Sequence, residues 1–173
     1  MKNISLKALW SGSAIGLLLF AGMMLQVVGL KTTTASNSAF ITGLNVVMVP
    51  IFSAIMLKKK PDRASFFGVA TAFAGLFFLS GGLDFNFNIG DFLTLLCSIC
   101  WAFQIIFIDK FNQKEDAPLL AILQMYFISI ASAVLWIACD WGKPLIFNGT
   151  SVAILLITGI FGSALAFGGQ TMA

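Results

Sequence analysis

The chain has 173 residues, of which 59% are hydrophobic and 10% are charged, and its net charge is +3. A soluble domain of this length carries roughly 25% charged residues on its surface, so this composition excludes a soluble globular protein and predicts a membrane protein. The few cations cluster in short loops and make no basic face, which argues against nucleic acid as a partner. Three cysteines in apolar segments, with no histidine, argue against a disulfide framework.

Six apolar blocks are each long enough to cross roughly 30 Å of hydrocarbon as a helix, which takes about 20 residues. The blocks are continuously apolar and do not alternate as membrane strands do. Asp91 is expected to cap the fourth block, and Pro118 suits the first turn of the fifth. The blocks cover residues 9–30, 37–57, 64–83, 91–108, 118–139 and 151–169. We therefore predict an all-α, polytopic bundle of six transmembrane helices.

The first block contains Gly12 and Gly16, a GxxxG pair that lets helix backbones approach closely in lipid. Such pairs indicate a bundle without identifying a partner. Near the ends of the first and sixth blocks, Gln26 and Gln170 each follow a small residue by four positions. A repeat of the first block by the sixth would fit a transporter built from inverted repeats, and chance similarity of two apolar helices is the alternative.

The second block carries a stripe of polar residues. Ser38, Thr42, Asn45 and Ser53 fall close to one face of a 3.6-residue helix, and Pro50 lies between them. Proline bends a membrane helix and is tolerated beside protein or a water-filled cavity. The stripe therefore predicts either a cavity wall or side chains that hydrogen-bond neighbouring helices, and these residues alone leave the two interpretations open.

A basic loop follows the second block and fixes the predicted orientation. It contains Lys58, Lys59, Lys60 and Arg63. Eight of the ten cations share the side of the N-terminus, and only Lys31 and Lys143 lie opposite. Short loops rich in lysine and arginine stay in the cytoplasm, so we predict a cytoplasmic N-terminus.

The remaining polar groups inside the blocks are isolated. Gln104, Gln124 and Tyr126 could touch a substrate, although such side chains more often satisfy one another between helices. Trp101 is expected to be first a large apolar contact. Cys97 and Cys100 share a helix face but have no further ligands nearby, so no metal site is expected. With no nucleophile–base pair in the sequence, we expect no enzyme.

The stretch from Gly29 to Pro50, with its Thr-Ala-Ser-Asn segment, resembles the EamA-type family of the drug/metabolite transporter superfamily. The resemblance continues through Gly90-Asp91-Phe92, which opens a helix carrying Trp101-Ala102. It implies a ten-helix fold made of two inverted five-helix repeats, in which the blocks here correspond to helices three to eight. On that reading residues 1–83 hold three helices of the first repeat and residues 84–173 hold three of the second.

In this family the third and fourth helices and their repeats border a central cavity. By that resemblance, Gln26, the stripe from Ser38 to Pro50 and Gln170 would line it. The substrate-pathway candidates are Gln26, Ser38, Thr42, Asn45, Pro50, Trp101, Gln104 and Gln170.

The sequence thus predicts a multi-pass carrier of the bacterial inner membrane that moves a small organic metabolite or drug by alternating access. The lipid bilayer, a small-molecule substrate and either a second copy or the missing helices of the same protein are the expected partners, and no cofactor is expected. The alternative is a truncated membrane fragment that does not transport, or a scaffold that needs a partner subunit.

Overall fold

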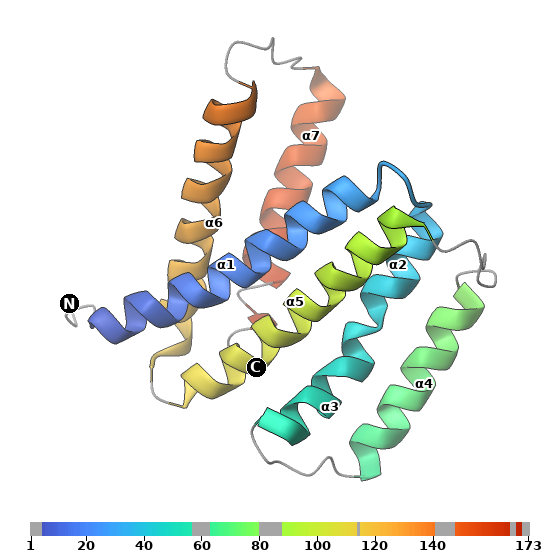
Figure 1. Ribbon diagram of the computed structural model, residues 1–173. Coiled ribbons are helices and arrows are strands. Elements are labelled where there is room, and N and C mark those ends of the chain that lie inside the picture. Colours follow the sequence, from blue (N-terminus) through green and yellow to red (C-terminus); the bar gives the residue numbers. More distant parts are fainter. Residues whose placement is uncertain are drawn as a thin grey trace. The chain divides into compact units, whose positions relative to one another are not determined.

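A computed structural model describes residues 5–56, 63–79, 88–113, 115–140, 148–166 and 169–170 (Figure 1). Within these ranges all regular structure is helical, which confirms the predicted all-α bundle. The elements are α1 (Leu6–Gly29), α2 (Ala35–Gly43), α3 (Asn45–Met56), α4 (Arg63–Leu79), α5 (Ile89–Asn112), α6 (Ala117–Asp140), α7 (Gly149–Ile157) and the π-helix η1 (Thr158–Leu165).

Four helical segments in the described ranges are long and apolar enough to span a membrane. They are Leu6–Gly29, Ala35–Met56, Ile89–Asn112 and Ala117–Cys139. The predicted third and sixth spans appear there as shorter apolar helices, Phe66–Gly75 and Gly149–Phe161. Parts of these two predicted spans, residues 80–83 and 167–168, lie outside the described residues.

The chain forms two compact units, one made of Met1–Leu17 and Phe111–Ala173, the other of Leu18–Lys110. In the first unit, Gly12 and Gly16 face α6. A Cβ atom added to Gly12 or Gly16 would lie less than 3.0 Å from Leu123 or Phe127, respectively. The predicted glycine pair therefore serves as a close-packing site, because only a residue without a side chain fits there.

The predicted sixth span is not one regular α-helix. It passes from α7 into η1 at Thr158, whose hydroxyl donates to the carbonyl of Ile154 at 2.7 Å. Gly159 and Gly162 follow within the π-helical stretch, and glycine weakens an α-helix relative to other residues. The predicted sixth span is therefore helical over residues 151–166, with an α-helical first part and a π-helical second part.

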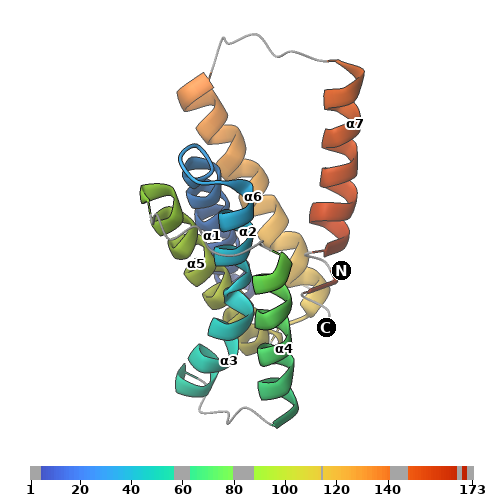
Figure 2. The same cartoon turned by 90° about the vertical axis from the view of Figure 1, so that its right-hand side faces the viewer.

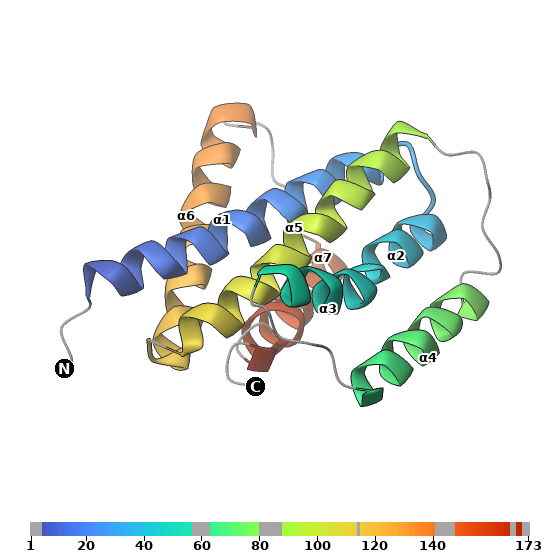
Figure 3. The ribbon, with the colours of Figure 1, turned by 60° about the horizontal axis from the view of Figure 1, so that its bottom comes forward.

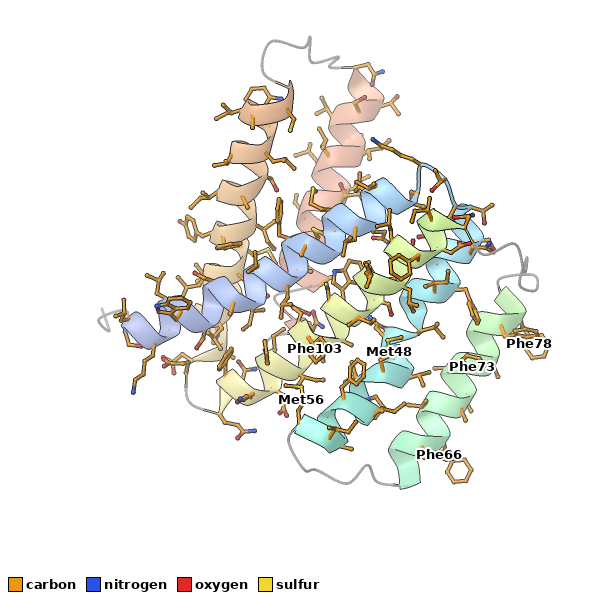
Figure 4. All side chains as sticks on the ribbon, viewed as in Figure 1. Met48, Met56, Phe66, Phe73, Phe78 and Phe103 are labelled. Atoms are coloured by element: carbon orange, nitrogen blue, oxygen red, sulfur yellow. The ribbon has the colours of Figure 1, made fainter. Side chains whose placement is uncertain are left out.

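In the second unit, α5 packs against the end of α1 and against α2 (Figures 1 and 3). The helices α3 and α4 lie side by side (Figures 1 and 2). Phe52 of α3 stacks on Phe103 of α5 with ring centroids 5.1 Å apart. Phe103 points from α5 towards α3, close to Met48 and Met56 (Figure 4). These aromatic and methionine side chains fill the space between the two helices.

The predicted second span appears as the helical segment Ala35–Met56, which is interrupted by a turn at Leu44. The helix α2 ends at Gly43 and α3 begins at Asn45, while the amide of Leu44 bonds to the carbonyl of Ile41 at 3.1 Å in a tighter turn. Pro50 lies inside α3, six residues beyond the break. The interruption therefore lies between Thr42 and Asn45, nearer the polar stripe than the proline at which a bend was expected.

Candidate functional site

Polar side chains from three apolar helices meet in the second unit. The amide Nε2 of Gln26 on α1 donates to the hydroxyl of Thr42 on α2 at 3.3 Å. The hydroxyl of Ser98 on α5 donates to the backbone carbonyl of Thr42 at 3.3 Å and lies 3.8 Å from the sulfur of Met48. The structure therefore brings together Gln26 and Thr42, two residues selected from the sequence.

The helix break explains why Ser98 finds an acceptor at Thr42. A helix that ends leaves the carbonyls of its last turn without a full set of intrahelical partners. Because α2 ends at Gly43, Thr42 belongs to that last turn, and Ser98 supplies a donor from the neighbouring helix. The polar contact is thus a consequence of the broken span.

Two buried donors beside this contact lack acceptors. Ser38 on α2 is 2% exposed, and within the described part of the chain its hydroxyl has no hydrogen-bond partner. The same holds for the buried indole Nε1 of Trp101 on α5. The indole packs against Gly22 so closely that a Cβ atom at Gly22 would lie less than 3.0 Å from Nε1. Buried donors of this kind are rare in folded proteins, and each one costs free energy.

The start of α5 is fixed by a capping box rather than by Asp91 alone. The side chain of Asn88 accepts from the amides of Gly90 and Asp91 at 2.8 and 3.0 Å. The Asp91 carboxylate in turn accepts from the amide of Asn88 at 2.9 Å. The expectation that Asp91 is the cap was therefore wrong by three residues, because Asn88 takes that position and Asp91 completes the reciprocal pair.

Asp91 also ties α5 to the turn between α1 and α2. It is 2% exposed, and its second carboxylate oxygen accepts a short hydrogen bond from the hydroxyl of Thr33. Close by, the backbones of Gly29 and Gly90 touch. A Cβ atom on Gly90 would lie less than 3.0 Å from both the carbonyl of Gly29 and the amide of Thr33. These contacts lock one end of the three-helix site.

The other predicted pathway residues occupy different places. Asn45 and Pro50 are half-buried on α3, and Gln104 is buried on α5, all in the same unit as Gln26. Gln170 is half-buried and belongs to the other unit. The roles of these side chains stay predictions.

Most of the residues predicted to set the topology lie outside the described residues. Lys58, Lys59 and Lys60 lie outside the described residues, and Arg63 is the first residue of α4. The predicted orientation therefore also stays a prediction.

Sequence reasoning missed Ser98, Thr33 and Gly22 as contact residues. Ser98 and Trp101 are three positions apart on α5 and so share a helix face, and Gly22 precedes Gln26 by four. These spacings could have marked the face of each helix that meets its neighbours. The partner of each residue could not be found in this way, because helix spacing carries no information about the next helix.

A metal ion has no evident place in the described ranges, where no group of three or more histidine, cysteine, aspartate or glutamate side chains is arranged to hold one. The thiol of Cys97 is buried, that of Cys100 is half-buried and that of Cys139 is exposed, and all three are free. The side chains around the contact of Gln26 and Thr42 carry neutral hydroxyl, amide and indole groups, and the carboxylate of Asp91 lies at one end of the site.

Comparison with known proteins identifies the family. The model of the EamA-like transporter family matches residues 1–81 and 88–173. An uncharacterized transporter of Archaeoglobus fulgidus is 37% identical over 155 residues, which cover 90% of this chain and 49% of the relative. The uncharacterized transporter YyaM of Bacillus subtilis is 25% identical, over 79% of this chain and 46% of its own length.

The chain spans about half the length of the curated relatives it matches. No solved structure matches it. The family match covers nearly every residue, and the apolar helices agree with it in kind. The chain is therefore a multi-pass membrane protein that belongs to the EamA-like transporter family.

Proposed function

We propose that this protein is a carrier, rather than an enzyme, and that it moves a small organic metabolite or drug across the membrane by alternating access. The observation that carries the proposal is the contact of Gln26, Thr42 and Ser98 across three apolar helices, next to a break in one of them. Transporters place polar groups beside discontinuous helices because these groups hold the solute near the middle of the membrane.

The broken span supplies the mobility that such a mechanism needs. With α2 and α3 joined at Leu44, the two halves can tilt separately, and Pro50 removes one further backbone hydrogen bond from α3. In our proposal the pathway runs past Asn45 and Gln104 as well as the central contact.

We further propose that residues 1–83 and 84–173 belong to two inverted repeats and that Gln170 corresponds to Gln26. The two separate segments matched by the family model, 1–81 and 88–173, support this division. The distribution of cations supports a cytoplasmic N-terminus. An inner membrane is the corresponding location in a bacterium.

Solute counterflow into proteoliposomes tests the proposal. The intact gene product is reconstituted, and a panel of amino acids, sugars and neutral drugs is screened for accumulation against a preloaded solute. We expect at least one solute to accumulate, and we expect Gln26→Leu and Thr42→Val to reduce its initial rate at least tenfold.

A matched control separates transport from folding. Tyr126 is 65% exposed on α6, so Tyr126→Phe removes a polar group of a membrane helix without touching the site. The control should transport like the unmodified protein, and all variants should insert equally. Unchanged counterflow by correctly inserted Gln26→Leu and Thr42→Val proteins would refute the proposed role of this contact.

A second candidate function is that of a subunit that transports only with partner helices. It is favoured by the length comparison, because the curated relatives are about twice as long as this chain. The mass of the native product extracted from its own membrane, together with its oligomeric state, tests this candidate. A single 18.6 kDa polypeptide that transports as a monomer would exclude it.

A further inference from the structure

We propose that Ser38 and Trp101 donate hydrogen bonds to the transported solute, and that this solute is an uncharged organic molecule bearing acceptor oxygens such as amide carbonyls. The inference rests on the proposed carrier function and specifies the substrate class of the same site. Its evidence is a pair of buried donors that the described part of the protein leaves without acceptors.

The hydroxyl of Ser38 is unusual for a serine in a helix. A serine inside a helix commonly bonds back to the carbonyl four residues earlier. In this structure the carbonyl of Thr34 accepts the backbone amide of Ser38 at 2.9 Å, and the hydroxyl bonds to no described group although the side chain is 2% exposed. A hydroxyl held in this way is available to a solute that enters the site.

Trp101 further restricts which functional groups the solute can carry. The indole N–H can only donate, so whatever binds it must present an acceptor. Gly22 leaves just enough room for the ring, since any side chain at that position would collide with Nε1 and Cδ1. The ring is therefore held by close packing of its Nε1 edge against α1. This N–H has no acceptor among the described residues, and in our proposal it reaches a solute when α1 and α5 move apart.

The two donors lie on opposite sides of the Gln26–Thr42 hydrogen bond. Trp101 is level with Gly22, one turn before Gln26 on α1, and Ser38 is one turn before Thr42 on α2. Because α1 and α2 run in opposite directions (Figure 1), the donors are separated along the helices by two turns, roughly 10 Å. A small organic molecule with two acceptors can span that distance, with Gln26 and Thr42 between them.

The charges around the site favour a neutral solute. Among the described side chains of Leu18–Lys110, the cations are Lys31 and Lys110, both exposed near helix ends. The buried carboxylate of Asp91 is already bonded to Thr33 and Asn88. A carboxylate placed between Ser38 and Trp101 would have no buried cation among the described residues to pair with, and an unpaired charge is costly away from water.

The first test compares two serines by thermal unfolding of the purified intact protein. Ser38→Ala removes an unsatisfied hydroxyl, so we expect an unchanged or raised Tm. Ser98→Ala removes a hydroxyl that bonds to Thr42, so we expect a lower Tm. A fall in Tm for Ser38→Ala equal to that for Ser98→Ala would overturn the inference, because the Ser38 hydroxyl would then be satisfied within the protein.

The second test uses three probes: N-acetylphenylalanine amide, its free acid N-acetylphenylalanine, and tetraphenylphosphonium, which has no acceptor. We expect the neutral amide to bind best and its affinity to fall roughly five- to tenfold in Ser38→Ala. We also expect the indole N–H band of Trp101 in resonance Raman spectra to shift on binding, in a protein carrying Trp10→Phe, Trp136→Phe and Trp141→Phe. Preferential binding of the acid or of the phosphonium ion, or an unshifted band with the amide bound, would overturn the inference.

The two proposals fail in different ways. If no solute in the counterflow panel is moved by the intact protein, the carrier function fails, and this inference fails with it. If solute is moved while Ser38→Ala and Trp101→Phe leave its affinity unchanged, the carrier function stands and only the assignment of these donors is rejected.

Discussion

The helices α4 and α5 are both apolar in sequence, but they differ in how many of their side chains are buried. Both are apolar helices of the second unit, yet α5 buries nine residues, from Gly90 to Ile108, whereas the described side chains of α4 are exposed or half-buried. Phe66 and Phe78 of α4 are 70% and 81% exposed and point away from α3 (Figure 4). Apolarity thus predicts that a helix enters the membrane without telling which face meets protein.

The physical reason is that lipid and protein interior are equally apolar. A phenylalanine gains little by exchanging one for the other, so helix contacts in membranes depend on small residues and on hydrogen bonds. On α5 the buried set includes Gly90, Asp91, Thr94 and Ser98. Small residues occur on α4 too, at Gly68, Ala70 and Gly75. The polar members of the buried set, through hydrogen bonds such as those of Asp91 and Ser98 to other elements, therefore distinguish the packed helix from the exposed one.

The largest expected effect comes from replacing Gly90, which lies where the start of α5 meets the end of α1. A methyl group at Gly90 would meet backbone atoms of Gly29 and Thr33, which cannot move aside easily. At Gly75 on α4 the same methyl group would meet no atom of another described element within 4 Å. We expect Gly90→Ala to lower the free energy of unfolding by about 2–3 kcal/mol and Gly75→Ala to leave it unchanged or raise it by up to about 1 kcal/mol. Thermal unfolding in detergent micelles measures both. Equal effects of the two substitutions would show that α5 is no more tightly packed than α4.

A somewhat smaller loss is expected from the capping box. Asp91→Ala leaves the Thr33 hydroxyl and the Asn88 amide without their acceptors in a buried place, so we expect a loss of about 2 kcal/mol. Asn148 caps α7 at an exposed position by accepting from the amide of Ser151 at 2.7 Å. Its replacement by alanine should cost about 1 kcal/mol. The same unfolding measurement compares the two, and an equal cost would mean that burial adds nothing to the Asp91 contacts.

The helix interruption and the contacts of Asp91 show which features of the structure the sequence could predict and which it could not. The helical class and the membrane setting followed from composition and block length, whereas the grouping of Gln26 with the polar stripe came from the resemblance to the family. The position of the helix interruption at Leu44 was not predicted, because Pro50 was the residue of this span that was expected to bend the helix. Asp91 was recognised as a capping residue, but its bond to Thr33 joins residues 58 positions apart. Such contacts depend on how helices pair, which local spacing does not encode.

Two phenylalanines of α4, Phe73 and Phe78, test whether that helix is exposed on every face. Phe73 meets Phe40 of α2 edge to face, with centroids 5.8 Å apart, while Phe78 is 81% exposed. We expect Phe73→Ala to cost about 1 kcal/mol and Phe78→Ala to change stability by less than about 0.5 kcal/mol. Both values come from unfolding in micelles. A larger loss for Phe78→Ala would reveal that another surface of protein covers that face of α4.

The smallest expected effect bears most directly on function. A double-mutant cycle of Gln26→Leu and Thr42→Val isolates the energy of their hydrogen bond, and such bonds between membrane helices average about 0.6 kcal/mol. A value near this average means that thermal motion or an entering solute can break the contact, as alternating access requires. A coupling above about 1.7 kcal/mol, the upper end for such bonds, would instead mark Gln26 and Thr42 as a fixed fastening between α1 and α2. The contact between α1 and α2 would then be structural, and the solute pathway would have to lie elsewhere.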